Sequence, residues 1–352
     1  MSQQIFKTVA MRLGVMLDAL CVTPLAGDAS ARTYSRLTWE INGNCKTAVL
    51  MMFDPSDSQA AEASSADAEN SAELPFVNIQ KHLKQCKIPV PDLFDSNVSE
   101  GWLLLEDLGD LTLLEAIRSA DEDTIERHYR RAIDILLCMH DRDESAHMAS
   151  GCIAYRRAFD EALWMWEFDH FIEYGIEARL GHALTETAKK EIRAYFSEIS
   201  FRLSRLPRVL THRDYHSRNL MVQDENRLRV LDFQDALMAP RQYDLASLLR
   251  DSYTDLPEAM VERLIAYYCK GHSQSRGSTV SVAAFLDIFD LVSLHRNLKA
   301  AGRFLYLDRV KHNDKFLVSV PLTLSKARRT LQRSARLGQL YRLLSDFVPE
   351  WQ

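Results

Sequence analysis

The apolar positions near the start of the chain predict a helix followed by a β-hairpin. Residues 3–20 place Ile5, Val9, Leu13 and other apolar residues three or four positions apart, which indicates one face of an amphipathic helix. The stretches ARTYSRLTWEI and CKTAVLMMF that follow are rich in β-branched and aromatic residues and are separated by Gly-containing NGN. Two β-prone runs around such a turn predict a hairpin.

The next segment predicts one more helix and two more strands. Residues 75–86, PFVNIQKHLKQC, have helical apolar spacing and begin with a proline, which suits a first helical turn. The stretches IPVPDLFDS and EGWLLLEDLG are short and strand-like. Residues 55–74 are mostly Ala, Ser and acids, so we expect a mobile loop there. The first lobe is therefore expected to be a small antiparallel sheet with one helix.

Helical patterns dominate the chain beyond Gly109. Residues 111–205 are mostly helical in spacing, residues 228–233 (LRVLDF) are strand-like, and helical spacing returns in four later segments. These segments are residues 241–252, 257–270, 281–305 and 322–347. The last one is basic on one side, and we expect that side to be solvated. The class is α+β, with an N-terminal lobe at residues 1–108 and a larger, mainly helical C-terminal lobe at 109–352.

Composition and charge narrow the function classes. The chain has 352 residues, 47% of them apolar, and a net charge of −6, so it has no general attraction for nucleic acid or anionic membranes. We find no apolar run of the length needed to span a bilayer. The six cysteines are scattered without a CxxC pair, which fits a reducing compartment. We therefore expect a cytoplasmic protein without nucleic-acid or membrane partners. The oligomeric state stays open.

The stretch THRDYHSRNLMV carries the strongest chemical signal. His212, Asp214 and Asn219 form an HxDxxxxN pattern, and Asp232 in VLDFQDA follows a short strand about a dozen residues later. An isolated HxD would be an ordinary polar turn. Combined with Asn219 and Asp232, the pattern fits phosphoryl transfer, which needs a carboxylate beside the attacking hydroxyl and oxygen ligands for Mg²⁺. We expect His212 to brace this loop by hydrogen bonds.

These motifs resemble the aminoglycoside phosphotransferase/choline kinase superfamily, and the resemblance covers nearly the whole chain. It implies a protein-kinase-like, two-lobed fold that uses ATP and Mg²⁺. It also implies that Asp214 is the catalytic base and that Asn219 and Asp232 bind the metal. Asp244, in PRQYDLASLL, resembles a buried Asp that orients the catalytic loop. An alternative role for Asp244 is the N-cap of the helix that follows.

The same resemblance implies a nucleotide site in the first lobe. LLLEDLG looks like the hinge whose backbone groups near Glu106 and Leu108 contact adenine. AGDASARTYSR looks like the loop that covers the phosphates, with Gly27, Ser30 and Arg32 as binding residues.

One feature of protein kinases is missing from the sequence. A Lys is expected on the third strand with a Glu partner on the following helix, but the strand reads TAVLMMFDP and PFVNIQKHLKQC contains no acid. Because both partners are absent together, we expect a different phosphate clamp, supplied by Arg32, Arg36 or Lys46. The double loss also leaves a non-catalytic pseudokinase as an alternative.

A narrower resemblance suggests the acceptor. AGDASARTYSR, THRDYHSRNLMV and HRNLKAAGRFLYL are similar to bacterial kinases that phosphorylate the anomeric C1 hydroxyl of N-acetylmuramate and N-acetylglucosamine in cell-wall recycling. The resemblance implies that the small-molecule acceptor is an amino sugar. Aminoglycoside O-phosphotransferase and choline-type kinase remain as alternatives.

Several polar side chains are candidates for contact with this acceptor. WMWEFDHFIEY combines aromatic faces, which suit a sugar ring, with Glu167 and Glu173, which suit hydroxyl groups. Its alternative role is a core stripe of an amphipathic helix. His216 and Arg218 lie in the catalytic loop, and Asp235 follows the metal-site Asp. We expect these five side chains to bind the acceptor, with contact to the phosphates as the alternative for His216 and Arg218.

Overall fold

The computed structural model of the chain describes residues 2–25, 32–55, 73–141, 151–224, 227–277 and 280–351. Gly27, Ser30 and most of the expected loop at 55–74 lie outside the described residues. The chain divides into two compact units. Unit 1 comprises Met1–Asp110 and Arg229–Gln234, and unit 2 comprises Leu111–Leu228 and Asp235–Gln352.

Unit 1 is built on a five-stranded antiparallel sheet with the order β1–β2–β3–β5–β4. The strands are β1 (Cys21–Leu25), β2 (Thr33–Ile41), β3 (Asn44–Met52), β4 (Leu93–Asn97) and β5 (Trp102–Leu105). The predicted hairpin is confirmed, because β2 pairs with β3 through a turn at Asn42 and Gly43. Both turn residues have positive φ, 52° and 72°, as a tight hairpin requires.

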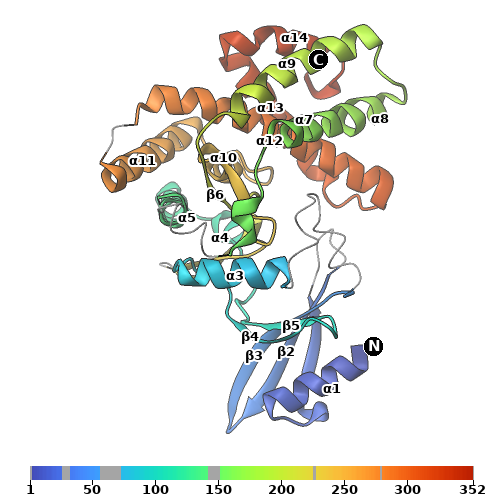
Figure 1. The fold of residues 1–352 in the computed structure, drawn as a ribbon, viewed down its shortest axis with the longest axis vertical. Coiled ribbons are helices and arrows are strands. Elements are labelled where there is room, and N and C mark those ends of the chain that lie inside the picture. Colours follow the sequence, from blue (N-terminus) through green and yellow to red (C-terminus); the bar gives the residue numbers. More distant parts are fainter. Residues whose placement is uncertain are drawn as a thin grey trace. The chain divides into compact units, whose positions relative to one another are not determined.

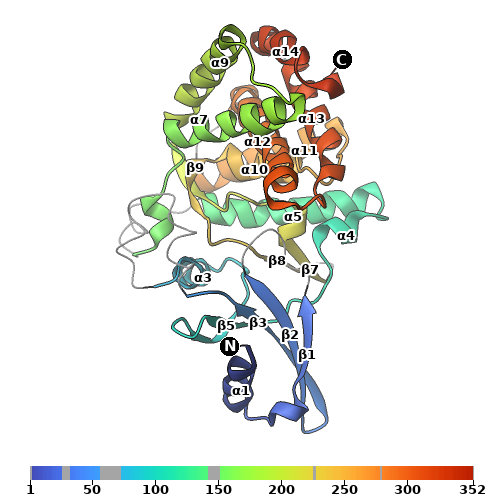
Figure 2. The same cartoon turned by 90° about the vertical axis from the view of Figure 1, so that its right-hand side faces the viewer.

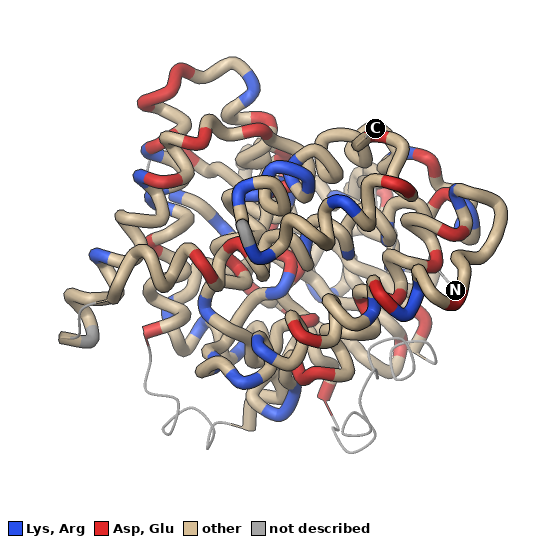
Figure 3. The backbone as a smooth tube through the Cα atoms, turned by 90° about the horizontal axis from the view of Figure 1, so that it is seen from above, with Lys and Arg blue, Asp and Glu red and all other residues tan. Residues whose placement is uncertain are grey.

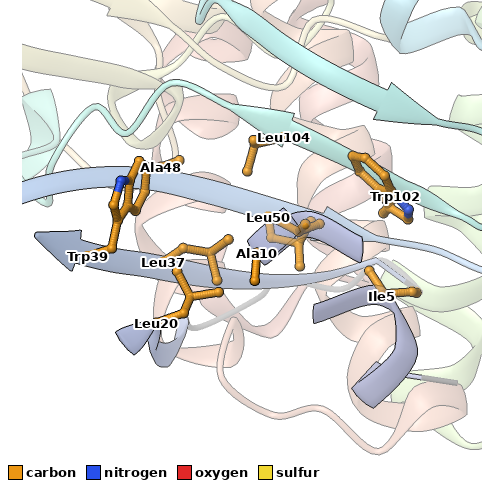
Figure 4. Packing of buried hydrophobic residues seen from close by; sticks show 10 residues of the cluster. Ile5, Ala10, Leu20, Leu37, Trp39, Ala48, Leu50, Trp102 and Leu104 are labelled. Carbon is orange, nitrogen blue, oxygen red and sulfur yellow. The ribbon is translucent and has the colours of Figure 1, made fainter. Parts of the chain in front are cut away.

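In the described part of unit 1, two helices accompany this sheet. Helix α1 (Ser2–Leu13) covers one face, and Figures 1 and 2 show α3 (Pro75–Gln85) on the opposite side. Ile5 and Ala10 of α1 point toward Leu37, Leu50 and other apolar residues of the strands (Figure 4). The alternation of buried and half-buried positions along β2 is what a sheet covered on one face by a helix needs.

Two predictions for unit 1 were wrong in detail. The first helix ends at Leu13 and not at residue 20, because Gly14 takes a φ of 71° and only a short 3₁₀ turn, η1 (Leu17–Ala19), follows. Strand β1 was not predicted, because Pro24 weakens its strand signal. As an edge strand, β1 tolerates a proline.

Unit 2 is mainly helical. Its α-helices are α4 (Leu113–Ile117), α5 (Glu122–His140), α7 (Glu161–His170), α8 (Ala178–Leu180), α9 (Glu186–Ser204), α10 (Gln242–Leu249), α11 (Glu258–Arg276), α12 (Val282–Lys311), α13 (Val320–Arg333) and α14 (Gly338–Ser345). A π-helix, η4 (Phe171–Glu177), continues α7. Short 3₁₀ turns are η3 (Ile153–Arg156), η5 (Ser217–Asn219), η6 (Leu317–Ser319), η7 (Ala335–Leu337) and η8 (Pro349–Trp351).

Helix α12 is the centre of unit 2. It contacts α7, η4, α10 and α13, and Figure 2 shows it among α7, α10 and α13. The helix comes close to η4 at Gly302, where an added Cβ would lie 2.9 Å from Cα of Phe171. The core stripe expected in WMWEFDHFIEY is confirmed, since Trp164, Phe168 and Phe171 are fully buried.

Short strands before and after the HRDYHSRN loop fix its two ends. β6 (Arg208–Thr211) pairs antiparallel with β9 (Leu237–Pro240), and β7 (Leu220–Asp224) forms a two-stranded sheet with β8 (Arg227–Val230). The loop therefore runs from the end of β6 to the start of β7. The predicted strand at 228–233 is shorter than expected, so Asp232 lies two residues beyond the end of β8.

The basic tail differs from its prediction. It forms two helices, α13 and α14, and not a single one. Its basic side is not simply solvated, because Lys326 is buried and donates to the carbonyl oxygens of Asp251 and Thr254. Arg329 also pairs with Asp255, at 2.6 Å. The tail is thus fixed to the core of unit 2 by its cations.

Charged residues of both signs are interspersed along the helices (Figure 3). None of the helices in the described part of the chain is both long enough and apolar enough to cross a membrane.

Candidate active site

The HRDYHSRN loop is held by a buried carboxylate from α10. Oδ2 of Asp244 accepts a hydrogen bond from the backbone N–H of His212 at 2.6 Å, and Oδ1 accepts one from Arg213 at 3.0 Å. Asp244 is fully buried, so its charge is stabilised by these N–H groups instead of water. The alternative N-cap role was wrong, because Arg241 occupies the N-cap position of α10.

A second carboxylate holds the other half of the loop. Oδ2 of Asp251 accepts from the backbone N–H of Ser217 at 2.9 Å and also from the Ser217 hydroxyl. Within the loop, Nδ2 of Asn219 donates to the carbonyl oxygen of Asp214 at 2.9 Å. These bonds fix Asp214 and Asn219 relative to each other. We did not assign Asp251 a role from the sequence, because the stretch DSY looks like the ordinary polar end of a helical segment.

Arg213 has an unusual backbone conformation beside Asp214. Its φ is 79°, in the left-handed region that favours glycine. The conformation is held from both sides: its N–H donates to Asp244, and its carbonyl oxygen accepts from Nη1 of Arg296 at 2.8 Å. Backbone strain of this kind concentrates at functional sites, where surrounding contacts maintain it.

The carboxylate of Asp214 lies against two cations of α12. Nη1 of Arg296 is 3.3 Å and Nζ of Lys299 is 3.5 Å from the same oxygen, Oδ1. Burial by itself raises the pKa of Asp214, but Lys299, Arg296 and Arg213 outweigh it and hold that pKa well below its ordinary value. Asp214 is therefore ionised across the neutral range. Both of these contacts are made by Oδ1.

A buried acid joins this cluster from α7. Glu167 is only 1% exposed, and its Oε1 lies 3.1 Å from Nη2 of Arg213 and 3.8 Å from Nζ of Lys299. Burial raises the pKa of Glu167, but Lys299 and Arg213 lower it overall. His295 lies 3.5 Å from Oε2, and burial lowers its pKa to about 3, so it is neutral near pH 7.

Two carboxylates, of Asp214 and Glu167, thus form one cluster with three cations, Arg213, Arg296 and Lys299. Among the residues joined by these ion pairs, the cations outnumber the carboxylates by one. Glu167 occupies an ion-pairing position inside the cluster, whereas Glu173 in η4 is exposed. Arg296 and Lys299 were not assigned a role from the sequence, although both lie in the HRNLKAAGRFLYL stretch noted there.

The other candidate residues of unit 2 lie around the same loop. The ring of His212 is buried and edge-on to Tyr215, with centroids 5.6 Å apart. His216 is edge-on to Tyr253 at 5.5 Å. The guanidinium of Arg218 lies over the Tyr253 ring at 5.0 Å and over Phe316 at 5.5 Å.

Asp235 is half-buried, and its negative charge acts on Arg157 and Arg213. It therefore lies within electrostatic reach of the cluster around Asp214.

Glu106, in the stretch of unit 1 that was expected to be the hinge, has a structural role. Oε1 of Glu106 accepts from Nη1 of Arg229 at 2.8 Å, and Oε2 accepts from the backbone N–H of Asp92 at 2.9 Å. The backbone N–H of Glu106 donates to the Asp92 carbonyl at 2.9 Å. This N–H is therefore occupied, and Leu108, which is buried, follows two residues later.

The three candidates for the missing phosphate clamp differ in their surroundings. Arg36 is bound to two acids, Asp107 at 2.7 Å and Asp110 at 2.9 Å. Lys46 is exposed on β3, and Arg32 is half-buried just before β2. Met51, near the position of the expected strand lysine, is buried in the core.

The two expected metal ligands belong to different units and are described separately. Asp232, in unit 1, is exposed, has a φ of 62° and accepts from Nε2 of Gln234 at 2.8 Å. Asn219, in unit 2, is buried, and its amide nitrogen is bonded to Asp214. Both side chains carry oxygen donors, which fit Mg²⁺. Within the described ranges no three His, Cys, Asp or Glu side chains group as a metal site.

Curated relatives are similar over most of their length. A protein of Pseudomonas putida named N-acetylmuramate/N-acetylglucosamine kinase is 30% identical over 332 residues, covering 92% of this chain and 88% of that protein. A protein of the same name from Neisseria meningitidis serogroup B is 28% identical over 329 residues, covering 93% of this chain and 90% of that protein.

Solved structures share the fold at low sequence identity. The ADP-bound aminoglycoside phosphotransferase APH(2'')-Ib has a TM-score of 0.60 at 13% identity, covering 93% of this chain and 98% of that one. Choline kinase LicA from Streptococcus pneumoniae also has a TM-score of 0.60, at 14% identity, covering 94% and 98%. The predicted α+β, protein-kinase-like fold is confirmed.

The model of the phosphotransferase enzyme family, APH, matches residues 22–278, which is more than half of the chain. The predicted superfamily and the predicted class of enzyme, a phosphotransferase, are therefore confirmed. The protein belongs to the phosphotransferase enzyme family.

Proposed function

We propose that this protein is an ATP-dependent kinase that phosphorylates the anomeric C1 hydroxyl of N-acetylmuramate or N-acetylglucosamine. The observation that carries this proposal is the position of Asp214, whose carboxylate is held ionised by Arg296 and Lys299. These cations come from the HRNLK stretch of α12, which lies outside the family match at residues 22–278. The names of the relatives support the choice of acceptor.

The reaction would be a direct, in-line transfer. The anomeric oxygen forms a bond to the γ-phosphorus of ATP as the bond from that phosphorus to the β–γ bridging oxygen breaks, and ADP leaves. The hydroxyl proton passes to Asp214. Since the transition state of such transfers is loose, a carboxylate with a low pKa suffices: it orients the hydroxyl and accepts its proton late.

The loop contacts support the role of Asp214 in this step. Asp244 holds the backbone before Asp214 and Asp251 holds the backbone after it. Catalysis by positioning requires a nucleophile-orienting group with little freedom, and these bonds provide it. His212 would act through the loop backbone, as a positioning residue.

Asn219 and Asp232 would hold Mg²⁺. The amide nitrogen of Asn219 is directed to Asp214, so its oxygen is the atom that would serve a cation. Oδ1 of Asp232 accepts from Gln234, which would orient that carboxylate. When bound, the metal would neutralise charge on the nucleotide phosphates.

The nucleotide would bind to the N-terminal lobe, which we place at residues 1–108. Gly27, Ser30 and Arg32 would contact the phosphates. Because the N–H of Glu106 is occupied, adenine would use the Glu106 carbonyl and the Leu108 N–H. Arg36 is already bound by two acids, so Lys46 is a better candidate than Arg36 for the missing clamp, and Arg32 stays a candidate.

The charge around Asp214 supports a sugar over an aminoglycoside. A polycationic acceptor needs carboxylates that are not neutralised, but Glu167 is paired with Arg213 and Lys299. A choline-type acceptor would also meet an excess of positive charge there. The acceptor and catalytic residues belong to the C-terminal lobe, residues 109–352, and a cytoplasmic location remains our expectation.

An acceptor panel tests this proposal. Formation of ADP is measured with N-acetylmuramate, N-acetylglucosamine, kanamycin and choline, and the products are analysed by mass spectrometry and ³¹P NMR. We expect a sugar 1-phosphate from one or both amino sugars, with little turnover of the two cations. Phosphorylation of kanamycin or choline alone would refute the proposed acceptor class.

A further inference from the structure

Four ring-bearing side chains form a group about one helical turn from the cluster around Asp214, namely Trp166, His170, Tyr174 and Tyr306. It joins η4 and the preceding end of α7 to α12 through close ring contacts. His170 lies 4.7 Å from the ring of Tyr174 and 5.3 Å from Tyr306, and these two tyrosines are edge-on at 5.0 Å. Trp166, which is 58% exposed, stacks on His170 at 5.5 Å.

The positions along the two helices place this group beside Asp214. His170 follows Glu167 by three residues, and Arg303 follows Lys299 by four, so each pair lies on one helical face. Glu167 and Lys299 belong to the cluster around Asp214. The step from Lys299 to Arg303 is about one turn, roughly 5–6 Å. A hexose ring spans a similar distance.

Arg303 differs from the other cations of the site. Arg213, Arg296 and Lys299 are each paired with Glu167 or Asp214. Arg303 is exposed, its guanidinium lies 4.9 Å from the centroid of the Tyr306 ring, and in the described part of the chain it forms no ion pair. Its positive charge is therefore available for an anion.

His170 provides an independent sign of a ligand. Its Nε2 is buried and has no hydrogen-bond partner among the described residues, although buried polar atoms normally have one. Burial, followed by the charge of Arg303, lowers the pKa of His170, so the ring is neutral near pH 7. A neutral imidazole beside Arg303 can donate to an anion or a hydroxyl.

The backbone around this group is also unusual. The seven residues Phe171–Glu177 form a π-helix, a form that is rare and often found at functional sites. Gly302 lets α12 approach η4 closely, which brings Arg303 and Tyr306 up to His170 and Tyr174.

We propose that Arg303, with His170 and Tyr306, is the subsite that binds a carboxylate of the acceptor, so that the enzyme selects the amino sugar bearing one. This inference rests on the proposed sugar kinase function. N-acetylmuramate carries a lactyl carboxylate and N-acetylglucosamine does not. The aromatic rings would contact a C–H face of the sugar, and Glu173, whose charge also acts on His170, would accept from a hydroxyl.

Kinetics with both sugars test this subsite. For Arg303→Gln, we expect KM for N-acetylmuramate to rise about 10-fold or more, since a charged hydrogen bond is lost. For N-acetylglucosamine, KM should stay within about twofold, and kcat should change little with either sugar. Arg303→Lys keeps the charge and should recover part of the affinity. Arg309→Gln, at an exposed arginine six residues further along α12 that pairs with Asp308, is the control and should behave as wild type.

Different outcomes separate this inference from the function on which it rests. If the wild-type enzyme phosphorylates neither sugar, the proposed function and the subsite both fail. If it phosphorylates both, and Arg303→Gln changes the two sugars equally or changes neither, the subsite alone is refuted. A general folding defect would lower kcat with both sugars and would also count against it.

Discussion

Nζ of Lys299 lies 3.5 Å from Oδ1 of Asp214, although the two residues are 85 positions apart in the sequence. Arg296, one turn earlier on α12, contacts the same oxygen at 3.3 Å. Burial and Asp214 act in opposite directions on the pKa of Lys299, and its net shift is upward. Both partners are thus charged near neutral pH, and α12 sets the ionisation of the proposed catalytic base.

Removing this cation should move the acid limb of the pH profile. In Lys299→Met, the carboxylate of Asp214 loses a positive neighbour, so its pKa rises. The fraction of ionised Asp214 at acidic pH then falls, and kcat/KM should decline at a higher pH than in wild type. The measurement is kcat/KM from about pH 3 to about pH 8, a range that includes the ordinary pKa of carboxyl groups. A loss of kcat/KM by the same factor at every pH would contradict the account.

Asp244 should be needed for the geometry of the loop. Asp244→Asn replaces one acceptor oxygen by an amide and removes the charge, which weakens the bonds from the N–H groups of His212 and Arg213. We expect a loss of about 2–3 kcal/mol in the free energy of unfolding, together with lower kcat. Urea denaturation and initial rates measure both. Asp123→Asn, at an exposed position of α5, is the control, and an equal effect there would refute the specific role.

The contact of α12 with η4 should be intolerant of a methyl group. In Gly302→Ala the new Cβ would lie 2.9 Å from backbone Cα of Phe171, so the helices must move apart. We expect a destabilisation of about 1–3 kcal/mol, measured by thermal unfolding. Gly338→Ala is the matched control, because nothing lies within 4 Å of its Cβ position. Equal stability of the two variants would show that the close approach is not required.

Lys326 should make stability depend on pH in alkaline solution. Burial lowers its pKa from 10.5 to about 8 in the folded protein. Between these values the unfolded chain binds more protons than the folded one, so stability rises with pH, by at most about 1.4 kcal/mol per pH unit. The unfolding free energy of wild type minus that of Lys326→Met should therefore increase from pH 8 to pH 10. A constant difference would contradict the lowered pKa.

Elements with local signals were predictable from the sequence. The NGN turn, the helix beginning at Pro75 and the HRDYHSRN loop each depend on residues close together in the chain. The first helix was predicted too long because apolar spacing continues past Gly14, where the backbone leaves the helix. Strand β1 was missed because edge strands depend on pairing with a neighbour more than on their own composition.

The cluster around Asp214 could not be predicted from the sequence, for a different reason. Two of its cations come from α12, its third cation and Asp214 come from the loop, and Glu167 comes from α7, so only tertiary packing brings them together. Lys326 illustrates the same limit: a basic helical face looks solvated until two backbone carbonyls are found to surround its ammonium group. The assigned roles of Gly27 and Ser30 stay predictions.

The central claim is that Asp214 orients and deprotonates the acceptor hydroxyl. The most direct measurement compares wild type with Asp214→Asn for transfer of the γ-phosphate of ATP to N-acetylmuramate, with ATP affinity determined in parallel by calorimetry. We predict that the variant loses transfer by about 10³-fold or more while ATP affinity stays within a few-fold, since the side chain acts in the chemical step. Sugar 1-phosphate formation at the wild-type rate by Asp214→Asn would contradict the account.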